Sequence, residues 1–218
     1  GTAYDAKVVP VRVLGHCGGT LSDIADAIVW ASGGSVSGVP ANPHPAEVIN
    51  LSLGGRGSCA ATLQRAIDNA VARGTTVVVS AGNKSADVAG YLPANCAGVI
   101  AVAATTRTGA KAGFSNFGTG IDISAPGQTI LSTLNAGVTL PREATYAAYN
   151  GTSMAAPHVA GVVALMQAVA PQPLSPAQVE SIIKSTARAL PGACSGGCGA
   201  GIVNADAAVD EAIASGKR

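Results

Sequence analysis

The stretch EVINLSLGGRGSCAATLQRAIDNAVARGTTVVVSAG, residues 47–82, contains a complete strand–helix–strand unit. EVINLSL (47–53) and TTVVVSAG (75–82) are short, rich in apolar residues and bounded by glycine, as buried strands are. Between them, CAATLQRAIDNAVARG has the apolar period of a helix and closes on Gly74, a residue type that commonly ends helices. Because strands that alternate with helices form parallel sheets, this unit predicts an α/β fold.

The same alternation continues on both sides of this unit. KVVPVRVL (7–14) predicts a buried strand, and Thr20 and Asp23 have the spacing of a capping box at a helix start. Further strands are expected in GVIAVAA (98–104), near GIDISAP (120–126) and near QTILSTL (128–134). Further helices are expected at 153–170, 175–190 and 204–216, the last two capped by Ser175 and Asn204. Without a repeat or linker, residues 1–218 are expected to form one domain, with a mostly parallel sheet and helices on both faces.

Charge and hydropathy argue against two classes of partner. Charged residues make up 11% of the chain, the formal net charge is +1, and there is no run of Lys or Arg. We therefore expect no binding to nucleic acid or to an anionic membrane surface. We also expect no membrane-spanning helix, because we find no apolar run of the roughly 18 to 20 residues that one needs.

The cysteines indicate an exported protein. Their spacing fits neither a zinc site nor a Cys-x-x-Cys redox pair, which favours disulfides formed outside the cell. We expect Cys17 to pair with Cys59 and Cys194 with Cys198, which leaves Cys96 without a partner. The alternative, five reduced and buried cysteines, stays open.

YNGTSMAAPHVAG (149–161) contains a serine suited to nucleophilic attack. Proline fits a helix only in its first turn, so Pro157 places Ser153 at a helix N-terminus. There a free N–H and the helix dipole favour the negative charge that develops when a serine attacks a carbonyl. His158 lies about 140° around the axis and roughly 7 to 8 Å along it from Ser153, so we interpret it as structural and not as the base.

Two other serine chemistries fit poorly. The nucleophile elbow of α/β-hydrolases requires Gly-x-Ser-x-Gly, and Ala155 stands where the second glycine would be. SIIK (181–184) spells Ser-x-x-Lys, but it lies inside an amphipathic helix pattern and has no later Lys-Thr-Gly, so we interpret it as a chance match.

GTSMAAPHVAG closely resembles the serine signature of the subtilisin-like serine peptidases, the subtilase family. Six further segments match in the same order: AKVVPVRVL, VINLSLGG, VVVSAGN, SNFG, ISAPG and GAGIVNADAAV. The segment CGGTLSDIADAIVWASGG looks most like bacterial extracellular members. The resemblance implies a three-layer α/β/α fold and a secreted endopeptidase that works through an acyl-enzyme on Ser153. Asn83 matches the family's oxyanion-hole asparagine.

The resemblance also implies the residues that bind an extended peptide. One binding edge would be Cys17, Gly18 and Gly19, and the other Leu53, Gly54 and Gly55. The primary specificity pocket would be lined by Ser80, Ala81, Gly82, Tyr91, Pro93 and Ala94. These residues carry no charge, which favours an uncharged substrate side chain. The chemistry needs no cofactor, and a structural calcium ion is expected without identifiable ligands.

One departure from the family pattern concerns the catalytic base. The family's Asp-Ser/Thr-Gly and His-Gly-Thr-x-Val-Ala-Gly motifs, which carry the triad Asp and His, are absent from this sequence. His16 and His44 stand in other contexts and do not replace the base. By resemblance, residues 1–218 correspond to the C-terminal two-thirds of the peptidase domain and begin past both motifs.

Three explanations fit this departure. The missing segment lies on an N-terminal fragment that binds this chain, or it is missing from the sequence, or the protein is a noncatalytic peptide-binding remnant. An esterase that uses the same serine is a more distant rival. On any of these explanations we expect the chain alone to be nearly inactive, because the base is not in it.

Overall fold

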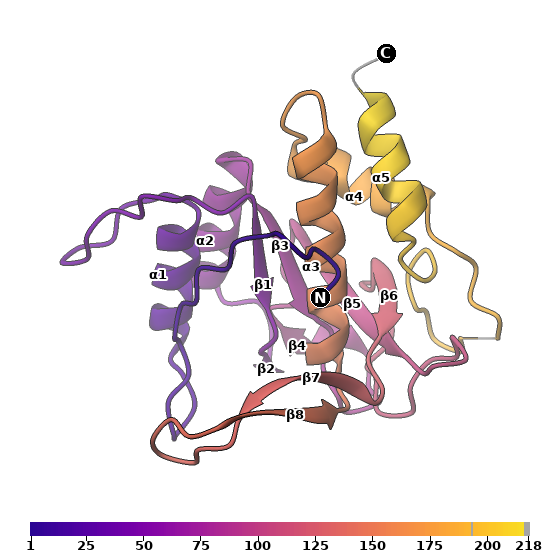
Figure 1. Ribbon diagram of the computed structural model, residues 1–218, viewed down its shortest axis with the longest axis horizontal. Helices are drawn as coiled ribbons and strands as arrows, with labels where there is room; N and C mark the ends of the chain where they lie inside the picture. The colour runs from indigo at the N-terminus through magenta and orange to yellow at the C-terminus, as the bar shows by residue number, and fades with distance from the viewer. Residues whose placement is uncertain (193, 216–218) are drawn as a thin grey trace.

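The computed structural model describes residues 1–192 and 194–215. Its centre is a parallel four-stranded sheet with the strand order β1-β3-β5-β6 (Figure 1). The strands are β1 (Val48–Leu51), β3 (Thr76–Ser80), β5 (Val99–Thr105) and β6 (Ile123–Pro126). Every residue of β3 and β5 is buried, as expected of inner strands that are covered on both faces.

Helices cover both faces of this sheet, as the sequence predicts (Figure 1). The helices are α1 (Leu21–Ala31) and α2 (Ala61–Ala72) on one face, and α3 (Thr152–Val169), α4 (Pro176–Ser185) and α5 (Ala205–Ala214) on the other. Along β3, Val78 belongs to the core under α3, whereas Val77 and Val79 belong to the core under α2. This alternation is the period of two expected of a strand and confirms the three-layer α/β/α fold.

The helix caps predicted from sequence are present. The Asp23 N–H donates to Thr20 Oγ1 at 3.1 Å, and Gly74, with a φ of +88°, follows the end of α2. Ser175 and Gln178 form a capping box, and Asn204 accepts a hydrogen bond from the first turn of α5. Local side-chain chemistry therefore fixes the ends of these helices.

Two small antiparallel sheets lie outside the central one. β2 (Gly55–Arg56) pairs with β4 (Tyr91–Leu92), which follows the 3-10 helix η1 (Val88–Gly90). β7 (Ile130–Asn135) pairs with β8 (Ala144–Tyr149) in a hairpin along the bottom of the view in Figure 1. The sequence predicts β7, whereas β8 was not expected. This hairpin leads directly into α3.

The strand predicted at residues 7–14 is wrong. The segment is irregular and open to solvent, with Val8 83% and Leu14 47% exposed. β1, at one edge of the sheet, pairs with β3 and has no second strand beside it among the described residues. A β-branched run becomes a strand only when another strand pairs with it, and among the described residues segment 7–14 pairs with none.

One predicted disulfide is wrong and the other is confirmed. Cys59 pairs with Cys96 across a Cα–Cα distance of 5.1 Å, while Cys17 is free and exposed. The β2–β4 pairing explains the bond, because Cys59 follows β2 and Cys96 follows β4. The pairing of Cys194 with Cys198 is as predicted.

The sequence-based expectation of no membrane-spanning helix is not met on length and composition alone. Within the described residues, α3 is long and apolar enough to cross a membrane. Core helices of globular proteins have the same property. Val159, Val163 and Met166 are fully buried against the sheet, and α3 contacts all four of its strands. These contacts identify α3 as the core helix of this fold.

Candidate active site

The serine and asparagine predicted for catalysis meet at the carboxyl edge of the sheet. Asn83 follows β3, Ser52 directly follows β1, and Ser153 is the second residue of α3. Carboxyl ends of parallel strands lie along one edge, which is where α/β folds commonly place their sites. Hydrogen bonds from Thr152 to Asn83 and from Ser52 to Ser153 hold the start of α3 at this edge.

The side chain of Asn83 has a fixed orientation. Its Oδ1 accepts hydrogen bonds from the Thr152 N–H at 2.8 Å and from Thr152 Oγ1 at 2.9 Å. Thr152 Oγ1 in turn accepts from the Gly82 N–H at 3.0 Å, so its own proton is available for Asn83. Because Oδ1 is engaged twice, the amide Nδ2 is the group that Asn83 can present to a substrate.

Asn83 Nδ2 and the Ser153 N–H flank one point. A Cβ placed on Gly151 would lie 3.5 Å from Asn83 Nδ2 and 3.6 Å from the Ser153 nitrogen. Ser153 lies in the first turn of α3, where an N–H has no carbonyl partner within its own helix. Two N–H donors whose nitrogen atoms lie this close to one point can stabilise the oxyanion of a tetrahedral intermediate.

Asn116, which lies in the SNFG motif, holds the loop that carries Asn83. It is fully buried, and its Nδ2 donates to the Ala81 carbonyl at 2.8 Å. Its Oδ1 accepts from the Lys84 N–H at 2.9 Å and from the Ala86 N–H at 3.1 Å. The loop is thus fixed on both sides of Asn83, and sequence reasoning assigned no role to Asn116 or to Thr152.

The residues predicted for one substrate edge and for the pocket lie together. Gly55 pairs with Leu92 in the β2–β4 sheet, and a Cβ on Gly54 would lie 2.7 Å from the Leu92 carbonyl oxygen. Gly82 has a φ of +103°, and a Cβ on it would reach the Tyr91 ring at 3.6 Å. Of the remaining predicted residues, Leu53 is half-buried and Ser80, Ala81, Pro93 and Ala94 are buried.

The other predicted edge, Cys17, Gly18 and Gly19, is part of a separate turn. The Gly15 N–H donates to the Gly18 carbonyl at 2.8 Å, and the Gly18 N–H donates back at 3.2 Å. Cys17 is exposed in this turn, and Gly18 has a φ of +93°. The turn belongs to neither of the small sheets described above.

The histidines lie away from the Ser153 hydroxyl. His158 Nδ1 is 2.8 Å from the Met154 carbonyl oxygen, so the ring is held against its own helix. His16 and His44 are exposed in loops outside α3. Within the described part of the chain, the Ser153 hydroxyl donates to the Ser52 carbonyl at 3.3 Å, not to a histidine.

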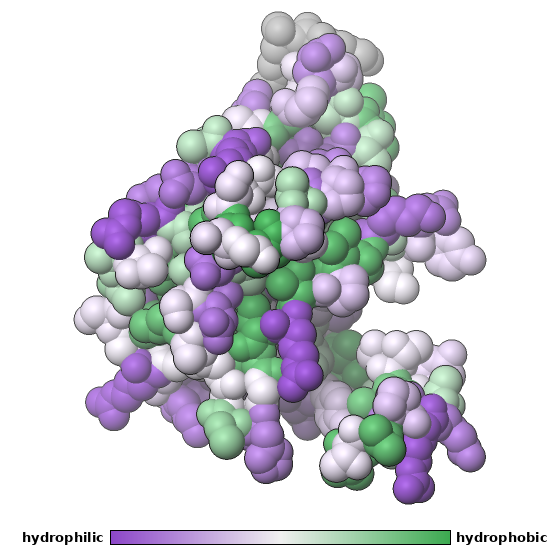
Figure 2. Space-filling view, turned by 90° about the vertical axis from the view of Figure 1, so that its left-hand side faces the viewer, coloured by the Kyte–Doolittle hydropathy of each residue, from purple (hydrophilic) through white to green (hydrophobic). Residues whose placement is uncertain are grey.

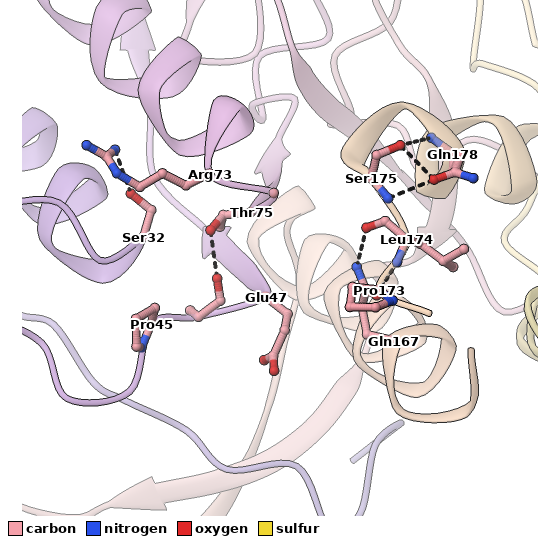
Figure 3. Close-up of a pocket in the computed structure, with 12 residues that line it drawn as sticks. Ser32, Pro45, Glu47, Arg73, Thr75, Gln167, Pro173, Leu174, Ser175 and Gln178 are labelled. Atoms are coloured by element: carbon pink, nitrogen blue, oxygen red, sulfur yellow. Dashed lines mark hydrogen bonds between the residues drawn. The ribbon is translucent and has the colours of Figure 1, made fainter. Parts of the chain in front are cut away.

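A shallow cavity of about 330 Å³ lies at the opposite edge of the sheet (Figure 3). Its lining includes Glu47 and Thr75, which precede β1 and β3, and Gln167 near the end of α3. Thr75 Oγ1 donates to the Ala46 carbonyl at 2.8 Å, and the Gln167 side chain exchanges two hydrogen bonds with the backbone of Leu174. These polar groups already have partners within the protein, and the cavity is remote from Ser153.

No group of three or more His, Cys, Asp or Glu side chains within residues 1–192 and 194–215 lies close enough to hold a metal ion. The described residues therefore offer no cluster of such side chains as a site for the structural calcium ion that the resemblance implies.

Comparison with known proteins identifies the family. The profile described as the subtilase family matches residues 1–201. The extracellular protease of Xanthomonas campestris pv. campestris is 76% identical over 98% of this chain and 37% of that protein. The extracellular basic protease of Dichelobacter nodosus is 44% identical over 100% of this chain and 37% of that protein. Subtilisin Savinase of Lederbergia lenta is 40% identical over 95% of this chain and 70% of that protein.

Solved structures agree with this identification. A protease from Pseudoalteromonas arctica PAMC 21717 superposes with a TM-score of 0.95 at 54% identity, covering 97% of this chain and 65% of that one. A cold adapted subtilisin-like serine proteinase gives a TM-score of 0.71 at 31% identity, covering 94% and 67%.

The chain spans 37% of the length of the first two curated relatives named above. Those relatives are named extracellular proteases, which confirms the expected extracellular location. The profile match, the relatives and the shared fold lead to one conclusion: the chain belongs to the subtilase family of subtilisin-like serine proteases.

Proposed function

We propose that this chain is the part of a secreted serine endopeptidase that carries the nucleophile Ser153 and the oxyanion hole. The observation that carries the proposal is the closeness of Asn83 Nδ2 and the Ser153 nitrogen to one point beside Gly151. The Thr152 hydrogen bonds that fix Asn83 support it, since preorganised donors stabilise a transition state without reorganisation.

The reaction follows from this geometry. Ser153 Oγ attacks the carbonyl carbon of the scissile peptide bond while a base removes its proton, and the carbonyl oxygen becomes an oxyanion. Asn83 Nδ2 and the Ser153 N–H donate to that oxyanion. The intermediate expels the amine as the proton is delivered to it, and water later hydrolyses the acyl-enzyme.

The base and its carboxylate come from an N-terminal segment of the same peptidase domain, of which residues 1–218 are the C-terminal two-thirds. Two features support this assignment. Among the described residues, one side of β1 pairs with no strand, and the β-branched segment 7–14 is mostly exposed. Figure 2 shows apolar surface open on one side of the molecule, above a deep notch. A covering segment would bury such surface, and without it the chain is nearly inactive.

The substrates are proteins and peptides bound in an extended conformation. Leu53, Gly54 and Gly55 offer backbone to one side of the peptide, and Cys17, Gly18 and Gly19 form the other side. The Ser80–Gly82 segment and the residues near Tyr91 receive an uncharged side chain, since no charged group lies among them. No cofactor takes part in the chemistry, and calcium has a structural role only.

A noncatalytic peptide-binding protein is the second candidate. The absence of the family's Asp and His motifs from residues 1–218 favours it. Such a protein would bind extended peptides at the same edge and leave them intact.

The test uses the intact secreted protein that contains this chain, with Ser153→Ala beside the native protein. Hydrolysis of an extended peptide and of a small ester is measured for both. Peptide hydrolysis that Ser153→Ala abolishes supports the peptidase. Peptide binding without hydrolysis by the native protein would establish the noncatalytic candidate, and hydrolysis of the ester alone would indicate an esterase.

A further inference from the structure

Pro157 is the sixth residue of α3 and lies in its second turn, not in the first turn where the sequence predicts it, although Ser153 is at the helix N-terminus as expected. An N–H at this position would donate to the carbonyl four residues earlier, which belongs to Ser153. Proline has no N–H, and its ring also crowds that carbonyl. The nucleophile's own carbonyl is therefore left without its helical partner at the point where α3 enters the active site.

Ser52 supplies the missing donor. Its Oγ donates to the Ser153 carbonyl at 2.8 Å, across 101 residues of sequence. Asn50 Nδ2 donates to the same Oγ at 3.0 Å, which occupies an acceptor site and leaves the hydroxyl proton for Ser153. In return, Ser153 Oγ donates to the Ser52 carbonyl at 3.3 Å. Ser52 thus bonds both the backbone and the side chain of the nucleophile.

The strand period explains why Ser52 can reach α3. Along β1 and the residue after it, Ile49 and Leu51 belong to the core under α1 and α2. Val48 packs against the core under α3, so Asn50 and Ser52, at the same parity, point to the α3 side. The sequence NLS therefore sets two polar side chains toward the first turn of α3.

We propose that Ser52 is a positioning residue for Ser153, and that its hydroxyl replaces the N–H that Pro157 removes. The role in catalysis rests on the proposed function; the structural role does not. Ser52 directly precedes Leu53, Gly54 and Gly55, so the strand end predicted to bind the peptide also fixes the orientation of the nucleophile.

A double-mutant cycle between Ser52 and Pro157 tests this directly. Pro157→Ala returns an N–H to the Ser153 carbonyl and makes the Ser52 hydroxyl redundant. The intact secreted protein is prepared as Ser52→Ala, Pro157→Ala and the double variant. Two quantities are measured: amide hydrogen exchange in the first turns of α3, and kcat and KM for an extended peptide.

We expect Ser52→Ala to speed exchange and lower kcat by about tenfold each when Pro157 is present, since one half-buried acceptor loses its donor. In the Pro157→Ala background the same change should alter both by less than about twofold. Ser52→Thr, which keeps the hydroxyl, should restore both quantities. Ser185→Ala is the matched control, because Ser185 Oγ also donates to a helix carbonyl, that of Ile182, far from the site.

Equal effects of Ser52→Ala in both backgrounds would overturn the proposal, as would a failure of Ser52→Thr to restore exchange. The two readouts separate this proposal from the proposed function. If the protein hydrolyses no peptide, the exchange cycle still reports whether Ser52 and Pro157 are coupled. If it hydrolyses peptides without coupling, the peptidase stands and the role of Ser52 is refuted.

Discussion

The two polar atoms of the Asn83 side chain have different roles in the site. Oδ1 accepts from the backbone and the hydroxyl of Thr152, and this leaves Nδ2 free to donate near Gly151, where a Cβ would lie 3.5 Å from it. A single nearly isosteric substitution can therefore remove the second task and keep the first.

Asn83→Asp keeps an oxygen for Thr152 and replaces the donor with an acceptor. We expect kcat for peptide hydrolysis to fall by about 10²- to 10³-fold, with little change in KM, because the lost donor acts on the oxyanion. Steady-state kinetics of the intact protein measures this. Asn69→Asp on the exposed face of α2 is the control, and a kcat for Asn83→Asp close to that of this control would contradict the assignment.

Asn116 affects the site indirectly, because it holds the loop that carries Asn83. Asn116→Ala removes the partner of the Ala81 carbonyl and of the Lys84 and Ala86 N–H groups, so we expect a loss of roughly 3 kcal/mol in unfolding free energy, together with a lower kcat. Urea unfolding and kinetics measure the two effects.

Asn42→Ala is the matched control for Asn116→Ala, since the Asn42 side chain also makes three hydrogen bonds, with Trp30, Ala31 and His44, but near α1. It should reduce stability and leave kcat unchanged. Equal effects of the two variants on kcat would show that Asn116 does not hold the Asn83 loop.

Sequence reasoning predicted Ser153 from its place at a helix start and Asn83 from its resemblance to a family motif. It did not reach Thr152, Asn116 or Ser52, whose partners lie between 30 and 101 residues away in sequence. NLSLGG and SNFG were recognised as motifs in the sequence. A motif identifies a residue but does not predict which distant backbone group its side chain will bond.

Among the elements, α4 is tied to the sheet by a charged cluster. Lys184 Nζ lies 2.9 Å from Asp122 Oδ1 and 2.9 Å from Glu180 Oε1. The other carboxylate oxygen of Asp122 accepts from the Ala101 N–H at 2.8 Å, which connects the cluster to β5. The hydrogen bond to Asp122, and then that to Glu180, raises the pKa of Lys184 above its ordinary value.

A raised pKa in the folded state means that folding favours the protonated amine. The contribution to stability is therefore complete below the ordinary Lys pKa of 10.5 and is lost as pH rises through the higher folded pKa. We expect the unfolding free energy to fall above this pH, and Lys184→Met to remove that part of the fall. Urea unfolding across alkaline pH measures it, with Lys7→Met as control; identical pH profiles for native protein and Lys184→Met would refute the link.

The two disulfides should differ in their contribution to stability. Cys59 and Cys96 are 37 residues apart, whereas Cys194 and Cys198 are 4 apart. On the chain-entropy account, replacing the first pair with serine should cost about 4 kcal/mol and the second about 2 kcal/mol. Urea unfolding of the two double variants tests the order, and a larger loss from the Cys194–Cys198 pair would contradict it.

The elements that sequence predicts well are those with local causes. Thr20, Ser175 and Asn204 cap their helices with their own side chains, so the helix starts can be predicted from the local sequence. Local sequence predicts the segment 7–14 and β8 poorly, because a strand forms only when another strand pairs with it. The Cys59–Cys96 bond likewise depends on the β2–β4 pairing, which spacing alone does not reveal.

The central sheet is well covered at its inner strands and less so at the β1 edge. β3 and β5 are covered on both faces, and the three helices α3, α4 and α5 close one side. At β1, by contrast, one edge pairs with no strand among the described residues, and the segment 7–14 is mostly exposed. On our account this edge belongs beside the segment that carries the catalytic Asp and His.

According to the proposed function, Ser153 is an activated nucleophile whose base comes from outside residues 1–218. The most direct measurement is active-site titration of the native secreted protein with a sulfonyl fluoride, followed by peptide mapping. We expect one label per molecule, on the peptide that contains Ser153, and peptides carrying an Asp and a His from sequence beyond this chain. A preparation that hydrolyses peptides while Ser153 stays unlabelled would contradict the claim.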